Sequence, residues 1–248
     1  MTTQHPDEDR QRLQQLAFYA SPPHPCSYLP DREAVSLFAD PNASMDMAIY
    51  SQLADYGFRR SGRHVYRPAC AGCHACIPAR IPAMEYRWRR WERRILKRNR
   101  DLQILVIAPD YRDEHFELYR KYIHIRHAGG GMDDPDPSRY LDFLTADWCE
   151  TDFVEFRDGC GKLLALAVCD RLARGLSAVY TWFDPDHAER SLGSFAILWQ
   201  IQEVLRRGRD YLYLGYWIED CAKMRYKGRY RPLEILRDGH WRRLGETG

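Results

Sequence analysis

The stretch LSAVYTWFDPDHAERSLGSFAILWQIQEVLRRGRDYLYLGYW, residues 176–217, decides the fold. It opens and closes with short apolar runs, rich in aromatic and β-branched residues, that are typical of strands. Between these runs, Ile197, Ile201 and Leu205 recur at helical spacing, and Gly208 follows as a stop signal. The stretch therefore predicts a strand, an amphipathic helix and a second strand in succession.

The residues before this stretch predict five more elements. In chain order these are a short buried strand, a helix, a second short helix and two strands, at residues 102–108, 112–127, 138–144, 152–156 and 162–169. The first helix is expected to bury Phe116, Tyr119 and Ile123, and an acidic, glycine-rich loop (128–137) follows it. Short turns around the last strands predict an antiparallel meander. The order β-α-α-β-β-β-α-β is that of the N-acetyltransferase-like fold, which binds an acyl carrier where its central strands splay.

We therefore expect an α+β protein of two domains. Residues 101–248 form the N-acetyltransferase-like domain, and residues 1–100 form a smaller, irregular α+β domain with a cysteine cluster. The smaller domain is rich in proline, and it contains a predicted helix with Ser44 as its cap and Gly57 as its stop. A hairpin around Ser61–Gly62 and a basic helix near residue 90 complete it.

Positive charge is segregated along the chain. The net charge is only +2, but residues 85–100 and 223–243 each hold eight Lys or Arg against two acids. The remaining residues carry 21 basic and 31 acidic side chains. Basic runs interleaved with Trp and Tyr suit a phosphate backbone with unpaired bases. The alternative is a solvated helix face followed by a basic tail, so the pattern alone leaves nucleic-acid binding open.

Composition also bears on the compartment. The longest apolar run, residues 163–169, is far too short to span a bilayer, and the polar, acidic start does not have the pattern of a signal peptide. Eight cysteines in such a chain are best interpreted as reduced thiols. We expect a cytoplasmic protein that does not bind membranes.

The run CAGCHAC places Cys70, Cys73 and Cys76 three residues apart. Thiolates at this spacing can hold one metal ion, but a tetrahedral site needs a fourth ligand from His74 or from a distant cysteine. The alternatives are a redox device or reduced thiols packed in a tight turn.

The residues before the last helix resemble, in part, a loop that binds pyrophosphate. Coenzyme A enzymes of this fold use Arg/Gln-x-x-Gly-x-Gly/Ala at a helix N-terminus. Here the loop runs from Arg190 through Gly193 to Phe195, and Phe195 stands where a small residue should let phosphate approach the backbone. Coenzyme A is therefore disfavoured. An aminoacylated RNA end is another acyl carrier, and the two basic runs could hold it.

Several long motifs resemble one protein family. The elements VYxxxDP (179–185), SLG (191–193) and KMxYKGxYRP (223–232) are similar to those of the aminoacyl-tRNA–protein transferases of the N-end rule pathway. The stretches PCSYLP, GFRRSGRHVYRP and CAGCHACIPARIP resemble the bacterial branch, the aspartate/glutamate leucyltransferases. The resemblance covers about residues 18–240.

This resemblance implies an activity. The expected reaction transfers leucine from leucyl-tRNA to the α-amine of proteins that begin with Asp or Glu, which marks them for degradation. The aminoacyl ester is already activated, so no cofactor is expected to be required and aminoacyl-tRNA is the co-substrate. Arginyl-tRNA–protein transfer is the alternative, because the choice of leucine depends on the branch. A non-catalytic tRNA-binding module and a small-molecule acetyltransferase are rivals from other classes.

The cysteines depart from the family pattern. Arginyltransferases carry Cys-x-Tyr-Cys near the N-terminus, a pair linked to iron–sulfur binding, whereas this chain has Cys26-Ser-Tyr28-Leu29. Leu29 replaces the second thiol. Cys26 could still join Cys70, Cys73 and Cys76 as four metal ligands, so the metal content stays open.

The matching positions supply candidate catalytic residues. Tyr180 and Trp182 are expected to line the central cleft, and Asp184 is a candidate proton acceptor or amine anchor. An N-terminal cap in the FDPDH turn is the alternative for Asp184. Ser191 and Gly193 are expected to present backbone donors to an oxyanion, with an ordinary helix cap as the alternative.

Two further groups are candidate substrate-binding residues. Lys223, Tyr226 and Lys227 are expected to contact RNA or the oxyanion. A pocket for an acidic side chain is predicted from four residues of the first domain, namely Arg59, Arg60, Ser61 and Tyr66. Because neighbouring side chains in a strand point to opposite faces, only one of the two arginines is expected to reach that pocket.

Overall fold

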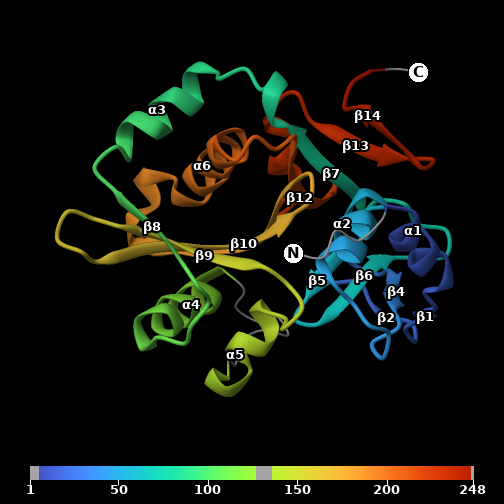
Figure 1. Ribbon diagram of the computed structural model, residues 1–248. Helices are drawn as coiled ribbons and strands as arrows, with labels where there is room; N and C mark the ends of the chain where they lie inside the picture. The colour runs from blue at the N-terminus through green and yellow to red at the C-terminus, as the bar shows by residue number, and fades with distance from the viewer. Residues whose placement is uncertain (1–5, 127–135, 247–248) are drawn as a thin grey trace.

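The structure is a computed structural model that describes residues 6–126 and 136–246, an α+β chain built around a large mixed sheet (Figure 1). Eight strands lie in this sheet in the order β14-β13-β7-β12-β11-β10-β9-β8. Their bounds are β7 Ile77–Pro82, β8 Gln103–Ile107, β9 Thr151–Arg157, β10 Leu163–Leu172, β11 Gly175–Phe183, β12 Tyr211–Trp217, β13 Glu234–Arg237 and β14 His240–Arg243. Four helices cover it: α3 Arg90–Arg98, α4 Asp113–Arg126, α5 Pro137–Leu144 and α6 Leu192–Arg206.

The predicted order of elements is confirmed from β8 to β12. The strands β9, β10 and β11 form the predicted antiparallel meander, and α6 then carries the chain to β12. The pair β11–β12 is parallel, whereas the other pairings within the sheet are antiparallel. The sequence did not reveal that β7, β13 and β14 extend the sheet beyond β12.

Helices cover both faces of the sheet. In Figure 1, α3 and α6 lie on one face, and α4 and α5 lie on the other. Each pair of helices closes a core of buried apolar side chains against the strands. Phe116, Tyr119 and Ile123 of α4 are buried in the second core, as their spacing predicts.

Two elements differ from what the sequence predicts. The strand at 102–108 was expected to be buried, but β8 is an edge strand in which Leu105 and Val106 are exposed. The helix α2 (Met47–Asp55) is capped by Asp46, whose Oδ1 accepts from the Ile49 amide at 2.9 Å, and not by Ser44. The predicted loop at 128–137 lies almost entirely outside the described residues.

The first part of the chain folds on a smaller sheet of order β1-β4-β6-β5. Its elements, together with a two-stranded ribbon and two helices, are α1 Pro6–Gln15, β1 Phe18–Ala20, β2 His24–Pro25, β3 Glu33–Ala34, β4 Ser36–Ala39, α2, β5 Arg59–Ser61 and β6 His64–Pro68. The strands β5 and β6 form the predicted hairpin. In the described parts of the chain, no helix has the length and apolar character needed to cross a membrane.

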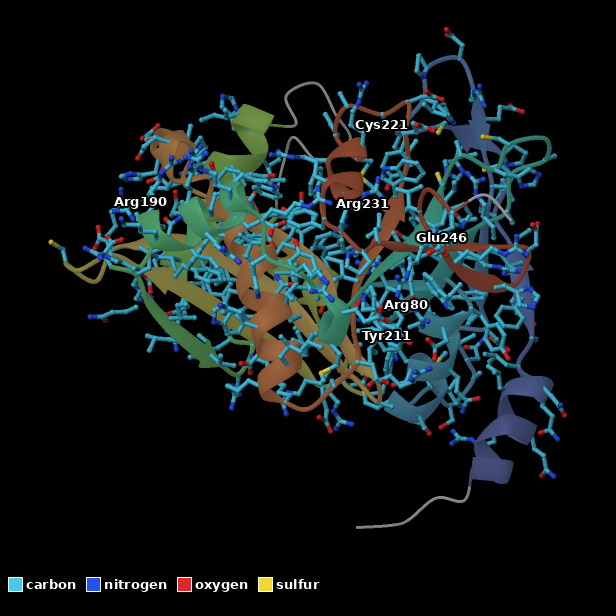
Figure 2. The ribbon with its side chains drawn as sticks, turned by 90° about the horizontal axis from the view of Figure 1, so that it is seen from above. Arg80, Arg190, Tyr211, Cys221, Arg231 and Glu246 are labelled. Atoms are coloured by element: carbon cyan, nitrogen blue, oxygen red, sulfur yellow. The ribbon has the colours of Figure 1, made fainter. Side chains whose placement is uncertain are left out.

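Arg80 on β7 links the large sheet to helix α2 of the first part of the chain. Its guanidinium contacts Asp55 at the end of α2 at 3.0 Å and Glu234 on β13 at 2.7 Å. It also stacks on the ring of Tyr211, 3.6 Å from the ring centroid (Figure 2). Since β7 lies between β13 and β12, the large sheet includes a strand from the first hundred residues.

Candidate active site

The two parallel strands β11 and β12 separate after a short paired segment. They are paired from Gly175–Tyr211 to Ser177–Tyr213. At the start the approach is close, because a Cβ on Gly175 would lie 1.9 Å from the Tyr211 carbonyl oxygen. Beyond Ser177 the pairing stops, and a bulge at Tyr213/Gly215 turns β12 away. The result is a splay that opens toward the carboxyl ends of both strands.

Arg59 of β5 reaches across into this splay. Its guanidinium donates to the Ser177 hydroxyl at 3.2 Å and to the Ala178 carbonyl at 2.5 Å. Gly215, at φ 75°, leaves the space for it, since a Cβ there would lie 3.0 Å from the guanidinium. Within the described residues, no carboxylate oxygen lies within 4.0 Å of Arg59. The half-buried cation therefore has only neutral acceptors in the structure.

Loss of solvent raises the pKa of four tyrosines near Arg59, although two of them, Tyr28 and Tyr226, are still 37% and 38% exposed. The pKa is about 12 for Tyr28 and for Tyr226, and it is raised for Tyr66 and well above 10 for Tyr216. The positive charge of Arg59 lowers the pKa of each of these tyrosines, but by less than the loss of solvent raises it. The Tyr216 hydroxyl lies 3.2 Å from the carbonyl oxygens of Gly57 and Tyr66. At neutral pH these side chains are uncharged hydrogen-bonding groups around one cation.

Lys227 lies in the floor of the same region. Only 7% of the residue is exposed, and its Nζ donates to the Tyr216 carbonyl at 2.7 Å. Burial, followed by the nearby charge of Arg59, lowers the pKa of Lys227 to about 7. The structure therefore removes Lys227 from the predicted RNA surface, while Lys223 is exposed and Tyr226 is 38% exposed.

Tyr180 and Trp182 differ in their access to the cleft. Tyr180 is half-buried against Tyr119 and Phe143, and its pKa is raised first by burial and then by other tyrosines, among them Tyr28. Its ring contacts are with the core under α4 and α5, and its place in the cleft stays a prediction. Trp182 is fully buried in the core against Tyr119, with ring centroids 5.3 Å apart. Trp182 therefore does not line the cleft, because α4 covers that face of β11.

Asp184 is an ionised cap. It is 2% exposed and accepts from Lys121 at 2.5 Å, from Lys162 at 3.0 Å and from the Asp186 amide at 3.2 Å. Burial alone would raise its pKa, but the hydrogen bonds from the two lysines lower it to about 2. A carboxylate with this pKa is a poor proton acceptor at neutral pH, so the geometry supports the cap and not the catalytic alternative.

The segment before α6 offers one backbone donor of the two predicted. Ser191 is in the left-handed region at φ 55°, and its amide donates to the Ala188 carbonyl at 3.1 Å. Gly193 lies in the first turn of α6, where amides have no intrahelical acceptor. Arg190 is paired with Asp101 at 2.9 Å, and Phe195 packs in the core. The loop therefore lacks a free arginine for pyrophosphate.

Arg60 points away from the cleft, on the opposite face of β5. It is 4% exposed, and its guanidinium contacts the two carboxylate oxygens of buried Asp170 at 2.6 and 2.8 Å. It also donates to the Leu144 carbonyl at 2.8 Å. A substrate carboxylate has no access to this group. Ser61 is half-buried at the end of the hairpin strand, where it pairs with His64.

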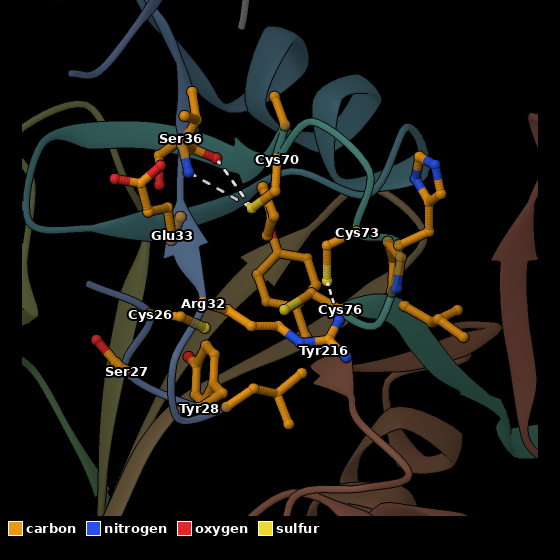
Figure 3. A pocket seen from close by; sticks show the side chains of 18 of the residues that line it. Cys26, Ser27, Tyr28, Arg32, Glu33, Ser36, Cys70, Cys73, Cys76 and Tyr216 are labelled. Atoms are coloured by element: carbon orange, nitrogen blue, oxygen red, sulfur yellow. Dashed lines mark hydrogen bonds between the residues drawn. The ribbon is translucent and has the colours of Figure 1, made fainter. Parts of the chain in front are cut away.

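The four cysteines of the cluster line one cavity of about 870 Å³, which shares walls with the cleft (Figure 3). Burial, and then the neighbouring thiols, raise the pKa of Cys76 to about 12. The pKa of Cys73 is lowered by a hydrogen bond from the Ala75 backbone and by Arg32, which donates to its sulfur at 3.3 Å. The thiol of Cys73 therefore ionises more readily than the thiol of Cys76.

The sulfurs do not converge on a single ion. Among the described residues, the one group with three potential ligand atoms within 4.8 Å of one another is Glu114, His115 and Glu155. Its carboxylates are already occupied, since Arg157 contacts both and His115 contacts Glu155 at 2.7 Å. Neither group fits a metal centre as the side chains stand.

A surface of unpaired cations joins the two basic runs. Trp91 of α3 contacts Tyr230 with ring centroids 5.7 Å apart, and the Arg229 guanidinium lies 4.5 Å from the Trp91 ring centroid. Glu92, the acid of α3, is turned inward and accepts from the Tyr86 hydroxyl at 2.6 Å. In the part of the chain that the structure describes, the exposed cations of this surface have no carboxylate partner within 4.0 Å: Arg87, Arg89, Arg90, Arg93, Arg94, Lys97 and Arg229.

Sequence reasoning missed the residues that shape the splay, above all Ser177 and Tyr216. One signal was present, because Gly215 interrupts an otherwise apolar strand, and a glycine there is typical of a bulge or a close approach. Together, a splayed cleft that holds a guanidinium and a buried amine, and a surface of exposed cations, indicate a protein that binds anionic groups and a polyanion.

Comparison with known proteins identifies the family. Models of arginine-tRNA-protein transferases match the chain twice, the N-terminal model at residues 24–94 and the C-terminal model at residues 114–237. The chain is 53% identical to the aspartate/glutamate leucyltransferase of Pseudomonas putida (strain W619), over 92% of this chain and 97% of that protein. The identity to the protein of that name from Nitrosococcus oceani is also 53%, over 93% and 97%. The chain therefore belongs to the arginine-tRNA-protein transferase family, a family of aminoacyltransferases.

Solved structures give more distant matches. The structure of L-PGS from Bacillus licheniformis aligns with a TM-score of 0.47 at 12% identity, over 86% of this chain and 76% of that one. The crystal structure of FemX aligns with a TM-score of 0.47 at 9% identity, over 77% and 65%.

Proposed function

We propose that this aminoacyltransferase moves leucine from leucyl-tRNA to the α-amine of proteins that begin with Asp or Glu. The names of the relatives at 53% identity support the choice of leucine and of acidic acceptors. The single observation that carries the proposal is Arg59, a half-buried cation in the splay with no carboxylate partner among the described residues. In this proposal the product is a substrate for degradation by the N-end rule pathway, and the reaction takes place in the cytoplasm.

The splay is the acyl-transfer site of this proposal, as in the N-acetyltransferase-like fold. The separation of β11 and β12 after Ser177 supports it, because unpaired backbone groups and the first turn of α6 then face one cleft. Coenzyme A is not the proposed carrier. Arg190 is paired with Asp101, and Phe195 stands where a coenzyme A-binding loop has a small residue. An aminoacylated tRNA end, held outside by the cationic surface, replaces it.

The chemistry needs positioning more than activation. The ester of leucyl-tRNA is a reactive acyl donor, so we propose that neither ATP nor a metal takes part. Arg59 holds the side-chain carboxylate of the acceptor protein, and this contact aims the α-amine at the ester carbonyl. The fork of arginine suits a carboxylate better than lysine does. The amide of Gly193 is our candidate donor to the oxyanion that develops.

The tRNA binds, in this proposal, on the surface around α3. Two observations support this surface. Trp91 of the first basic run contacts Arg229 and Tyr230 of the second, and Glu92 is buried, so it does not neutralise the exposed cations. The partly exposed ring of Trp91 beside the cations suits the unpaired end of an acceptor stem, whose bases can stack.

Replacing Arg93 and Arg94 together with Ala tests this surface. Each phosphate that the protein no longer neutralises keeps about one counterion, so the slope of log K against log salt should become shallower by about one or two. The apparent KM for leucyl-tRNA should rise about tenfold at moderate salt, while the peptide KM stays unchanged. The matched control replaces Arg120 and Arg139, exposed arginines on the opposite face of the sheet. Equal salt slopes for the two double variants would move the tRNA elsewhere.

A transfer assay tests the function itself. Labelled leucine should pass from leucyl-tRNA to peptides that begin with Asp or Glu and not to one that begins with Ala, with a chelator present and no ATP or coenzyme A. A non-catalytic tRNA-binding module would bind the tRNA and leave the peptide unlabelled. That outcome would end the proposal.

A further inference from the structure

A buried amine in the splay has no anionic partner among the residues that the structure describes. Lys227 lies on the short 3-10 helix η3 (Arg225–Arg229), which folds back over the end of β12. Its neighbours Arg225 and Tyr226 are exposed, whereas Lys227 turns inward and its Nζ donates to the Tyr216 carbonyl at 2.7 Å. Tyr216 belongs to the part of β12 that no longer pairs with β11. The amine therefore lies beside the unpaired backbone of the proposed acyl-transfer cleft.

The groups around this amine come from several elements, and none of those within the described residues is a carboxylate. Arg59 approaches from β5, Tyr226 lies beside it on η3 and Met224 Sδ is 3.7 Å from Nζ. The thiols of Cys76 and Cys221 are the other titratable groups near this amine. Within residues 6–126 and 136–246 no Asp or Glu oxygen lies within 4.0 Å of Nζ. An ammonium here would be buried beside a second cation, so the neutral amine is favoured.

We propose that Lys227 is the proton carrier of the transfer reaction. Its neutral amine accepts the proton that the attacking α-amine loses, as the new nitrogen–carbon bond forms at the ester carbonyl. The resulting ammonium then gives that proton to the ribose oxygen, as the carbon–oxygen bond to the tRNA breaks. Lys227 returns to the neutral form, and no other reactant is consumed. The inference rests on the proposed function, because it assigns a residue to that reaction.

Other titratable groups of the site are unsuited to this role. Asp184 has a pKa of about 2, and the pKa values of Tyr28 and Tyr226 are about 12. The pKa of Cys76 is also raised to about 12. A proton carrier works best with a pKa close to the working pH, and the pKa of Lys227 is lowered to about 7. The geometry and the acid–base chemistry therefore select the same residue.

The test uses two variants and a matched control. Lys227→Met removes the amine, and Lys227→Arg keeps a permanent positive charge that cannot take up a proton. Arg120→Met, at an exposed cation of α4 outside the cleft, controls for the loss of a surface charge. At saturating leucyl-tRNA and Asp-peptide, kcat should fall about 100-fold or more in both Lys227 variants, while both KM values change less than threefold. The control should retain the wild-type kcat.

The pH profile separates a proton carrier from a structural lysine. The wild-type kcat should fall as the pH drops below about 7, because Lys227 is then protonated. The α-amine of the peptide titrates near pH 8 whichever enzyme variant is assayed. An inflection of the kcat profile that is present in the wild type and absent from both Lys227 variants therefore belongs to Lys227. A kcat for Lys227→Met within threefold of the wild-type value, or a loss confined to KM, overturns the proposal.

A direct titration guards against variants that fail to fold. In the wild-type protein carrying ¹³C-labelled lysine, the side-chain resonance that disappears in Lys227→Arg should titrate near pH 7, and a midpoint above about 9 overturns the assignment. Melting temperatures of the variants supply the folding control. If the wild type itself moves no leucine, the proposed function fails, which is distinct from a transfer that proceeds normally without Lys227.

Discussion

Arg59→Gln is expected to abolish the preference for acidic N-termini, lowering kcat/KM for Asp- and Glu-starting peptides by tenfold or more. The guanidinium is half-buried in the splay and has only the Ser177 hydroxyl and the Ala178 carbonyl as hydrogen-bond acceptors among the described residues. A substrate carboxylate would supply the missing anion, and a neutral side chain would leave the cation unpaired, which costs more than about 1.4 kcal/mol. The comparison of an Asp-peptide with its isosteric Asn-peptide measures this selectivity directly.

Two further variants sharpen that result. Arg59→Lys keeps the charge but loses the fork, so selectivity should fall to an intermediate value. Arg63→Gln, at an exposed arginine of the same hairpin, should leave selectivity unchanged. Binding of leucyl-tRNA should be nearly unaffected in all three proteins. Full Asp-over-Asn selectivity in Arg59→Gln would mean that another cation holds the carboxylate.

Arg60→Met is expected to act on stability and not on selectivity. The change leaves the carboxylate of Asp170 buried without its cation, although the hydroxyls of Tyr50 and Thr151 still donate to it. Breaking a buried ion pair on one side lowers the free energy of unfolding by about 3–5 kcal/mol. Equilibrium denaturation in urea measures it. A folded fraction of the variant should still prefer Asp-peptides, because Arg59 is intact.

The double variant Arg60→Met/Asp170→Leu provides the control for the ion pair. Since both charges are removed together, most of the lost stability should return. A loss below about 1 kcal/mol in the single variant would show that the pair contributes little. A single variant that stays stable but loses selectivity would instead assign the carboxylate pocket to Arg60.

The two arginines show how far the sequence can lead. The strand period predicts that Arg59 and Arg60 point to opposite faces, and this is confirmed. Which face meets the cleft depends on the contact of β5 with β11, more than a hundred residues later. No local pattern encodes that contact. The element order from β8 to β12 was predictable because each element shows its own periodicity, whereas the entry of β7 into the large sheet depends on distant pairings.

Burial of charged residues is what the sequence showed least. Lys227 lies in a dense charged motif, so the sequence suggested contact with RNA or an oxyanion, and η3 turns it inward onto β12. Asp184 ends a strand beside the cleft, and the sequence left a catalytic role and a helix cap equally open; Lys121 and Lys162 keep it ionised. In both cases the surroundings that decide the pKa include residues remote in sequence. Residue type and spacing alone cannot supply that information.

The central claim is that this chain gives leucine, and not arginine, to an acidic N-terminus. The most direct measurement is a competition in one reaction, with leucyl-tRNA and arginyl-tRNA at equal concentration, an Asp-starting peptide and its Asn counterpart. Mass spectrometry of the products reads both choices at once. We expect the Asp-peptide to gain the mass of one leucine while the Asn-peptide stays largely unmodified. A product that carries arginine, or equal modification of the two peptides, would contradict the claim.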